Sequence, residues 1–227
     1  MTTGWLALVG GAEWNPGCTF DERLWAESGA DEVLVLPTAA AYEHPERAVA
    51  NAERHFASFG AKARGLMVLR RADAEDPENA AAVRESRFVY LAGGSPMHLR
   101  SVLKDSAVWQ ALVDAHAGGA VLAGSSAGAM VLCDPMVDPR GGAFTLGLGL
   151  VRQLAVIPHH DTWSQEKAKR TIHLGPRGVP LVAVDEQTAV LRPPDGSWVV
   201  EGAGTAVVFV NGSEAGLEAL PRSPLAV

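Results

Sequence analysis

The sequence predicts one α/β domain, residues 1–227, in three layers: a mostly parallel central sheet with helices on both faces. Five short runs rich in Val, Leu and Ala lack polar alternation, as buried parallel strands do. Longer polar, alanine-rich segments with helical spacing separate these runs. In the last third, apolar runs follow one another across short turns, which predicts an antiparallel C-terminal extension of the sheet.

The apolar and polar runs set the expected elements. Strands are expected at 5–9, 32–36, 65–69, 88–92 and 120–123, and helices at 44–59, 77–85 and 97–116. A strand at 155–158 and a polar helix at 164–172 follow. The closely spaced strands of the last third are expected at 181–184, 189–191, 198–200 and 206–210. A chain of 227 residues buries a sufficient core as one domain.

Composition narrows the class of function. The net charge is −7 and the acids and bases are scattered, so no basic stripe for nucleic acid is present. No apolar stretch approaches the roughly 18 residues of a membrane helix, and MTTGWLALVGGAEW lacks the basic start of a signal peptide. Cys18 and Cys133 are too few for a disulfide framework. We therefore expect a cytoplasmic protein with no membrane or nucleic-acid partner.

The segment AVLAGSSAGAM, residues 120–130, runs from a predicted strand into small residues that open a helix. It contains G-x-S-x-G, the pattern of a nucleophile elbow, whose register selects Ser126 over Ser125. The glycines let neighbouring backbone pass close to the turn, and the N–H of Ala127 can face a developing oxyanion. A turn needed only for close strand–helix packing is the alternative interpretation.

A serine hydroxyl needs a base, and His159 and His160 are the candidates. They follow an apolar run and Pro158, so they lie at a strand end, where α/β sheets gather their sites. Adjacent residues on an extended chain point in opposite directions, so only one of the two can face Ser126. The same geometry disfavours a metal site with Asp161, and we expect no metal or cofactor. The remaining histidines are expected at the surface: His44, His55, His98, His116 and His173.

A carboxylate should orient the imidazole. Asp134 and Asp138 follow the elbow helix, Asp161 follows the histidines, and Glu186 lies between two predicted strands. Spacing does not choose among them, and each taken alone also reads as an ordinary loop carboxylate.

A second glycine segment lies in FVYLAGGSPMHL, residues 88–99. Ser95 suits a helix N-cap and Pro96 the first helical position. Gly93 and Gly94 permit close backbone approach to a ligand, and Gly94 N–H is the simplest second oxyanion donor. A plain strand–helix turn is the alternative, and the segment lacks the G-K-[ST] of a P-loop.

Four segments in this order, AGGSPMHL, GSSAGAM, IPHHD and VDEQTAVL, resemble the dipeptidase E and cyanophycinase family of serine peptidases. That family is similar in fold to class I glutamine amidotransferases, with serine in place of the elbow cysteine. The resemblance implies Ser126 as nucleophile, His159 as base, and Gly94 and Ala127 as oxyanion donors.

The resemblance also implies an acid in the loop after the elbow helix, which best matches Asp134. Asp138 stays possible because this loop is short, and Glu186 in the D-E-x-T-A segment is the second choice. Glu13, Trp14 and Trp163 are expected to line the pocket, from their places beside predicted strand ends.

The resemblance further implies a small, aspartyl peptide as substrate, because family members cleave after an N-terminal aspartate or within a β-linked Asp–Arg polymer. A cation must then hold the aspartyl carboxylate. Arg170 is the first choice, with Arg140 and Arg152 as alternatives. A different amide or ester hydrolase on the same fold, or a catalytically silent ligand-binding relative, remains open. A homodimer is compatible with the sequence.

Overall fold

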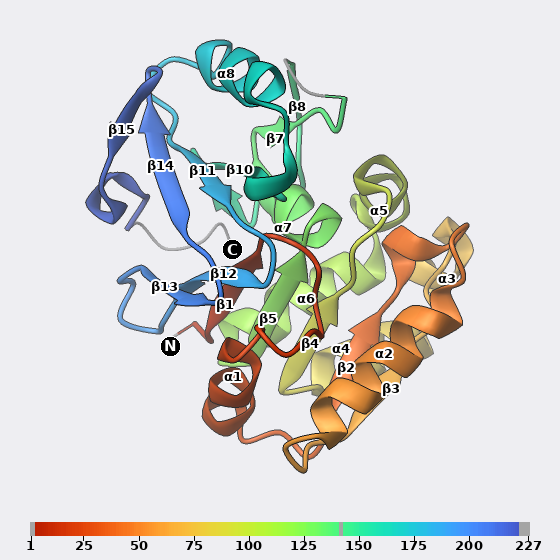
Figure 1. Ribbon diagram of the computed structural model, residues 1–227. Helices are drawn as coiled ribbons and strands as arrows, with labels where there is room; N and C mark the ends of the chain where they lie inside the picture. The colour runs from red at the N-terminus through yellow and green to blue at the C-terminus, as the bar shows by residue number, and fades with distance from the viewer. Residues whose placement is uncertain (1–2, 141–142, 223–227) are drawn as a thin grey trace.

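The computed structural model describes residues 3–140 and 143–222 and is built around a seven-stranded sheet (Figure 1). Its strands are β1 (Leu6–Val9), β2 (Val33–Leu36), β3 (Ala63–Gly65), β4 (Phe88–Leu91), β5 (Val121–Ser125), β12 (Thr188–Arg192) and β13 (Val199–Gly202). The order across the sheet is β13-β12-β1-β5-β4-β2-β3. The first five strands pair in parallel, and β12 and β13 extend the sheet antiparallel beyond β1.

Helices cover both faces because alternate side chains of every central strand enter two apolar clusters. On β4, Phe88 and Tyr90 join one cluster, whereas Val89 and Leu91 join the other. The first cluster includes residues of α1 (Phe20–Ser28) and α2 (Pro45–Ala57). The second includes residues of α3 (Arg71–Glu75), α4 (Pro77–Glu85), α5 (Pro96–Leu103), α6 (Ala107–Ala117) and α7 (Ala127–Leu132). The predicted three-layer α/β fold is confirmed.

A second, four-stranded sheet lies above the first in Figure 1. Its strands are β10 (Ala155–Ile157), β11 (Leu181–Val184), β14 (Ala206–Val210) and β15 (Ser213–Ala215), and α8 (Gln165–His173) accompanies them. The last third was expected to extend a single sheet. Only β12 and β13 extend the main sheet. β11 and β14 pair antiparallel as expected, but in the second sheet, where β10 is parallel to β11.

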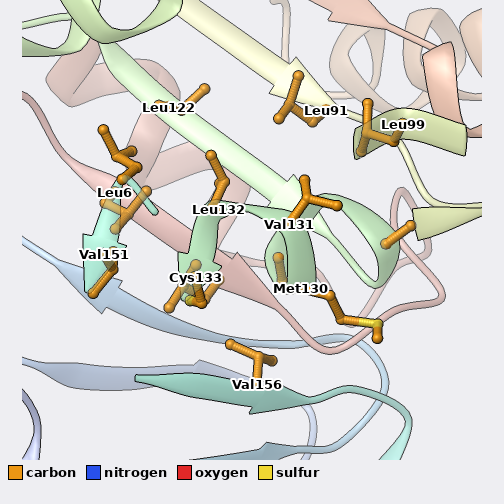
Figure 2. Packing of buried hydrophobic residues seen from close by; sticks show 14 of the residues in the cluster. Leu6, Leu91, Leu99, Leu122, Met130, Val131, Leu132, Cys133, Val151 and Val156 are labelled. Carbon is orange, nitrogen blue, oxygen red and sulfur yellow. The ribbon is translucent and has the colours of Figure 1, made fainter. Parts of the chain in front are cut away.

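The short helix α7 lies between the two sheets. Figure 2 shows its Met130 and Val131 in the same packed cluster as Leu122 of the main sheet and Val156 of the second. Each of these side chains is at most 3% exposed, so the helix that follows the elbow is fixed from both sides.

Short elements complete the chain. They are β6 (Cys133–Asp134) paired with β9 (Val151–Arg152), β7 (Met136–Val137) paired with β8 (Phe144–Thr145), and three 3₁₀ turns at Thr38–Ala40, His160–Thr162 and Leu217–Ala219. No helix in the described part of the chain is long and apolar enough to span a bilayer.

Two expected elements have different bounds. The helix expected at 97–116 is two helices, because Asp105 takes φ 56° and Ser106 caps α6 by accepting a hydrogen bond from Trp109 N–H. The third strand ends at Gly65, whereas it was expected to begin there. Helix α1 was not expected; its one clear signal is Gly29, whose φ of 56° ends the helix.

The parallel strands end at one edge of the main sheet. Val9 pairs with Ser125, and Leu91 pairs with Gly124, so the segments after β1, β4 and β5 emerge together. Because β12 is antiparallel, its first residues lie at this same edge. Four segments far apart in sequence therefore meet there.

Candidate active site

Ser126 lies at the sharp turn between β5 and α7. Its φ of 47° and ψ of −104° lie outside the favoured regions for an L-residue. The turn is held by hydrogen bonds from Ser126 N–H to Val9 O (2.9 Å) and from Met130 N–H to Ser126 O (2.9 Å). A Cβ on Gly128 would lie 2.6 Å from the Leu91 carbonyl oxygen, so this glycine is needed for the helix to approach β4.

A hydrogen-bonded chain connects Ser126, His159 and Glu186. Ser126 Oγ lies 2.8 Å from His159 Nε2, and His159 Nδ1 lies 2.7 Å from Glu186 Oε1. A carboxylate only accepts hydrogen bonds, so Nδ1 carries the proton and Nε2 is free to accept the serine proton. The side chains of His159 and Glu186 are each 31% exposed, which lets water reach the imidazole.

The end of β1 positions the imidazole. His159 N–H donates to Gly10 O (2.8 Å), and His159 takes φ 53°. The ring lies against Gly11, where a Cβ would be 2.1 Å from the imidazole Cε1. Sequence reasoning missed both glycines, although G-G directly after the first predicted strand was a visible signal.

Glu186 lies in the short connection between β11 and β12. Its N–H donates to Asp161 Oδ1 (3.0 Å), and its carbonyl accepts from Thr188 Oγ1 (3.0 Å). Gln187 N–H donates to Gly11 O (2.8 Å), so the same glycine borders both His159 and the Glu186 segment. Asp161 thus helps to fix the segment that carries Glu186.

Asp134 is not placed as the family resemblance implied. Its Oδ1 accepts from Gly147 N–H (3.0 Å), and among the residues that the structure describes it makes no hydrogen bond or ion pair with His159. Asp138 instead pairs with Arg140, whose hydrogen bond lowers the pKa of Asp138 to about 2. Of the candidate carboxylates, Glu186 is the one that the structure brings to the imidazole, through the strand pairing of β12 with β1.

Gly94 and Ala127 lie just beyond the ends of the neighbouring strands β4 and β5. Each lies three residues beyond one of the paired residues Leu91 and Gly124. Neither N–H has a hydrogen-bond acceptor within residues 3–140 and 143–222, whereas Gly93 N–H donates to Glu13. Gly94 takes φ 134°, and a Cβ there would lie 2.4 Å from Ala39 O, so only glycine fits.

Arg170 lies on an exposed face of α8. It lines a cavity of about 610 Å³ with Phe209 and Gly212, and in the described residues no contact joins it to the Ser126–His159–Glu186 chain. Arg140 and Arg152 are likewise exposed.

The second candidate base, His160, lies beside Asp185, with its Nδ1 3.5 Å from Asp185 Oδ1. Within the ranges described, no three His, Cys, Asp or Glu side chains gather to hold a metal ion.

Three histidines expected at the surface are buried or half-buried. His116 is 2% exposed, and burial lowers its pKa to about 4. His55 is hydrogen-bonded to the fully buried Asp21 (3.0 Å), and His98 Nε2 lies 2.9 Å from Leu69 O. Helical spacing alone did not show which side of each helix faces the sheet. Of the pocket residues expected, Glu13 and Trp14 line a cavity of about 610 Å³, but the residues that line it do not include Ser126, His159 or Glu186. Trp163 packs against Lys167.

The geometry agrees with a comparison to known families: the model of peptidase family S51 matches residues 11–197. The chain belongs to peptidase family S51. The resemblance to dipeptidase E and cyanophycinase and the prediction of a serine peptidase are thereby confirmed.

Individual proteins similar to this chain are named cyanophycinase or peptidase. A cyanophycinase from Trichormus variabilis is 26% identical over 88% of this chain and 72% of its own length, and one from Synechococcus elongatus is 27% identical over 63% and 48%. The solved structure of a peptidase from an acI-B1 actinobacterium has a TM-score of 0.83 at 29% identity, covering 94% of this S51 chain and 93% of its own. A candidate peptidase E from Listeria monocytogenes shares the fold, with a TM-score of 0.68 at 16% identity and coverage of 89% and 100%.

Proposed function

We propose that this S51 peptidase cleaves a small aspartyl peptide by acyl transfer, with Ser126 as nucleophile, His159 as base and Glu186 as the group that orients the base. The hydrogen-bonded chain from Ser126 Oγ through His159 to Glu186 is the observation that carries the proposal. Strained backbone at a nucleophile is typical of the elbow that exposes a serine hydroxyl.

In the acylation step, Ser126 Oγ bonds to the peptide carbonyl carbon while its proton passes to His159 Nε2. The carbonyl oxygen becomes an oxyanion, for which the N–H groups of Gly94 and Ala127 are the available donors. Glu186 stabilises the imidazolium through Nδ1–H. The C–N bond then breaks, and His159 gives its proton to the departing amine.

Deacylation repeats these steps with water. His159, partly open to solvent, takes a proton from a water molecule whose oxygen attacks the acyl carbon. The Ser126 oxygen leaves and recovers its proton from His159. The carboxylic acid product is released and the free serine is restored.

The aspartyl preference is supported by relatives named cyanophycinase and by the motif resemblance. This part of the proposal does not depend on Arg170, which lies on the exposed side of α8.

The test has a chemical and a substrate arm. A fluorophosphonate probe should label the wild type at Ser126, and Ser126→Ala should abolish labelling. The same pair is then incubated with Asp-X dipeptides, isoaspartyl dipeptides and a β-Asp-Arg peptide. We expect wild-type cleavage of at least one, and a loss in kcat on the order of 10⁴- to 10⁶-fold in Ser126→Ala.

The outcomes separate the parts of the proposal. Labelling at Ser126 without cleavage of any aspartyl peptide would reject the substrate and favour another amide or ester. Equal cleavage by the wild type and Ser126→Ala would reject Ser126 as the nucleophile. An unlabelled, inactive wild type that still binds one of these peptides would favour a silent ligand-binding relative.

A further inference from the structure

Glu13, in the loop after β1, bridges the two segments that carry the candidate oxyanion donors. Its Oε1 accepts from Gly93 N–H (2.8 Å), and its Oε2 accepts from Ser125 Oγ–H (2.7 Å). Gly93 precedes Gly94 on the segment after β4, and Ser125 precedes Ser126 at the end of β5. One carboxylate therefore ties the glycine turn to the nucleophile elbow.

The glycine turn depends on fixed backbone hydrogen bonds. Ala92 N–H donates to Leu36 O (3.1 Å), and Ser95 N–H donates to Ala39 O (2.8 Å). With Gly93 N–H held by Glu13, Gly94 N–H is the group in this stretch that keeps no acceptor within the described residues. A peptide between two glycines has the widest conformational freedom of any, so its direction must be imposed from outside. Glu13 supplies the contact on its N-terminal side.

The second hydrogen bond accounts for Ser125. Its side chain is fully buried and its hydroxyl donates to Glu13, whereas His159 Nε2 is paired with Ser126 Oγ. Ser125 gives the Glu13 carboxylate a rigid support on β5. The carboxylate is thus held on one side by the elbow strand while it holds the glycine turn on the other.

Glu13 makes no ion pair in the residues that the structure describes. Its partners are an N–H and an O–H, although Arg54 lines the same cavity of about 610 Å³. A carboxylate placed for charge compensation would be matched with a cation. The contacts of Glu13 instead match a group placed for the direction of its hydrogen bonds.

We propose that Glu13 is a positioning residue that holds the Gly94 N–H and the Ser126 elbow in register, so that the oxyanion hole is formed before the substrate arrives. The proposal rests on the proposed acyl-transfer function. Glu13 touches neither substrate nor reacting atoms; it acts through Gly93 and Ser125. Its loss should lower the rate of the chemical step and leave the affinity for the probe or substrate nearly unchanged.

Four variants test whether the effect of Glu13 comes from its hydrogen bonds, from its charge or from its place in the cavity wall. Glu13→Ala removes both hydrogen bonds. Glu13→Gln keeps the side-chain length, and its amide oxygen can accept from Gly93 N–H while its NH₂ donates to Ser125 Oγ. Ser125→Ala removes the support alone. Glu22→Ala is the matched control, because Glu22 lines the same cavity and is exposed.

The readout is the rate of Ser126 labelling by a fluorophosphonate, resolved into the maximal rate and the half-saturating concentration. In this reaction the serine oxygen bonds to phosphorus while its proton passes to His159, the P–F bond breaks and fluoride leaves, and the phosphoryl oxygen occupies the oxyanion hole. We expect Glu13→Ala to lower the maximal rate by about 10²- to 10³-fold, the loss typical of one oxyanion donor. The maximal labelling rate of Glu13→Gln should lie within about tenfold of the wild-type rate, and that of Glu22→Ala should equal the wild-type rate.

A Glu13→Ala variant that labels at the wild-type rate would overturn the proposal, as would a change confined to the half-saturating concentration. If Glu13→Ala does not fold, Ser125→Ala decides, with a lowered maximal rate expected and an unchanged one overturning. Failure of the acyl-transfer proposal looks different: the wild type itself then shows no labelling at Ser126, and the role of Glu13 is rejected with it.

Discussion

Three of the non-glycine residues with left-handed backbone donate hydrogen bonds to the end of the first strand. Ser126, His159 and Gln187 take φ of 47°, 53° and 54°. Such conformations each cost on the order of 1 kcal/mol or more and persist where the surroundings impose them. Here each strained residue donates its N–H to a carbonyl at the end of β1, Val9, Gly10 or Gly11 respectively. The backbone carbonyls at the end of β1 therefore hold all three residues in their strained conformations.

The choice of acid can be tested at the residue scale. Glu186→Gln replaces the acceptor of His159 Nδ1–H by an amide that can favour the wrong tautomer, so kcat should fall by about 10²- to 10⁴-fold. Asp134→Asn should leave kcat within about threefold of wild type, because Asp134 holds Gly147 N–H and not His159.

Steady-state kinetics of both variants on one Ser126-dependent substrate measure the difference. Circular dichroism confirms that each is folded. A larger loss of kcat in Asp134→Asn than in Glu186→Gln would contradict the assignment of the acid.

At the scale of elements, the sequence predicted correctly those helices and strands that a contiguous local pattern determines. The strand at Phe88–Leu91 is buried on both faces, so its unbroken apolar run marked it clearly. The elbow was found for the same reason, since strand, G-x-S-x-G and small residues are contiguous. The break at Asp105 gave no comparable signal, because one left-handed residue and one cap divide an otherwise continuous helical pattern.

The sequence did not choose among the candidate carboxylates, because contact with His159 depends on pairing between distant strands. Asp134 is close to Ser126 in sequence, but Glu186 reaches the site only through the antiparallel pairing of β12 with β1. The role of Glu13 is of the same kind, since its two partners lie on β5 and after β4. Residue type gave the candidates, whereas long-range strand order sets which of them lies beside His159.

The turn after β1 supplies a prediction at this scale. In Gly11→Ala the new Cβ would overlap the His159 ring, at 2.1 Å from Cε1, so the imidazole must move. A displacement of about 1 Å can cost 10²-fold in rate, and we expect a loss of kcat of at least that size. Gly60→Ala is the control, because Gly60 also has a positive φ, 81°, but open space around its Cβ position.

Thermal unfolding and kinetics of the two variants distinguish strain from displacement. Gly60→Ala should lose about 1 kcal/mol of stability from its left-handed backbone and keep full activity. Equal activity of Gly11→Ala and Gly60→Ala would show that the imidazole does not depend on the space at Gly11.

At the scale of the whole molecule, the candidate triad joins two sheets. Ser126 follows β5 of the main sheet, His159 follows β10 of the second, and Glu186 lies in the connection between them. Helix α7 packs between the sheets through Met130 and Val131 (Figure 2). The 2.8 Å contact between Ser126 and His159 therefore depends on how this buried helix spaces the two sheets.

Two buried groups should give the stability of the whole fold opposite pH dependences. Burial lowers the pKa of His116 from 6.5 to about 4, so between these values the unfolded chain binds a proton that the native state does not. This contribution is complete above pH 6.5 and is lost as pH falls, by roughly 3 kcal/mol. Burial raises the pKa of Asp21 from 3.8 to about 6, against the opposing hydrogen bond from His55. The native state then binds the extra proton, and stability rises by roughly 3 kcal/mol as pH falls from 6 to 4.

The two contributions oppose each other in one window, so substitution of either should reveal the other. In Asp21→Asn the His116 contribution remains, and the free energy of unfolding should fall more steeply than in wild type between pH 6.5 and 4. In His116→Gln the Asp21 contribution remains, and the same curve should become flatter or rise toward acid. Urea unfolding at pH 4.5, 5.5 and 7 gives the change of unfolding free energy with pH for the wild type and for each variant. The remaining carboxylates contribute equally in all three proteins. Slopes that shift in the same direction in both variants would contradict the assignment, because only groups with opposite pKa shifts separate the curves on either side of wild type.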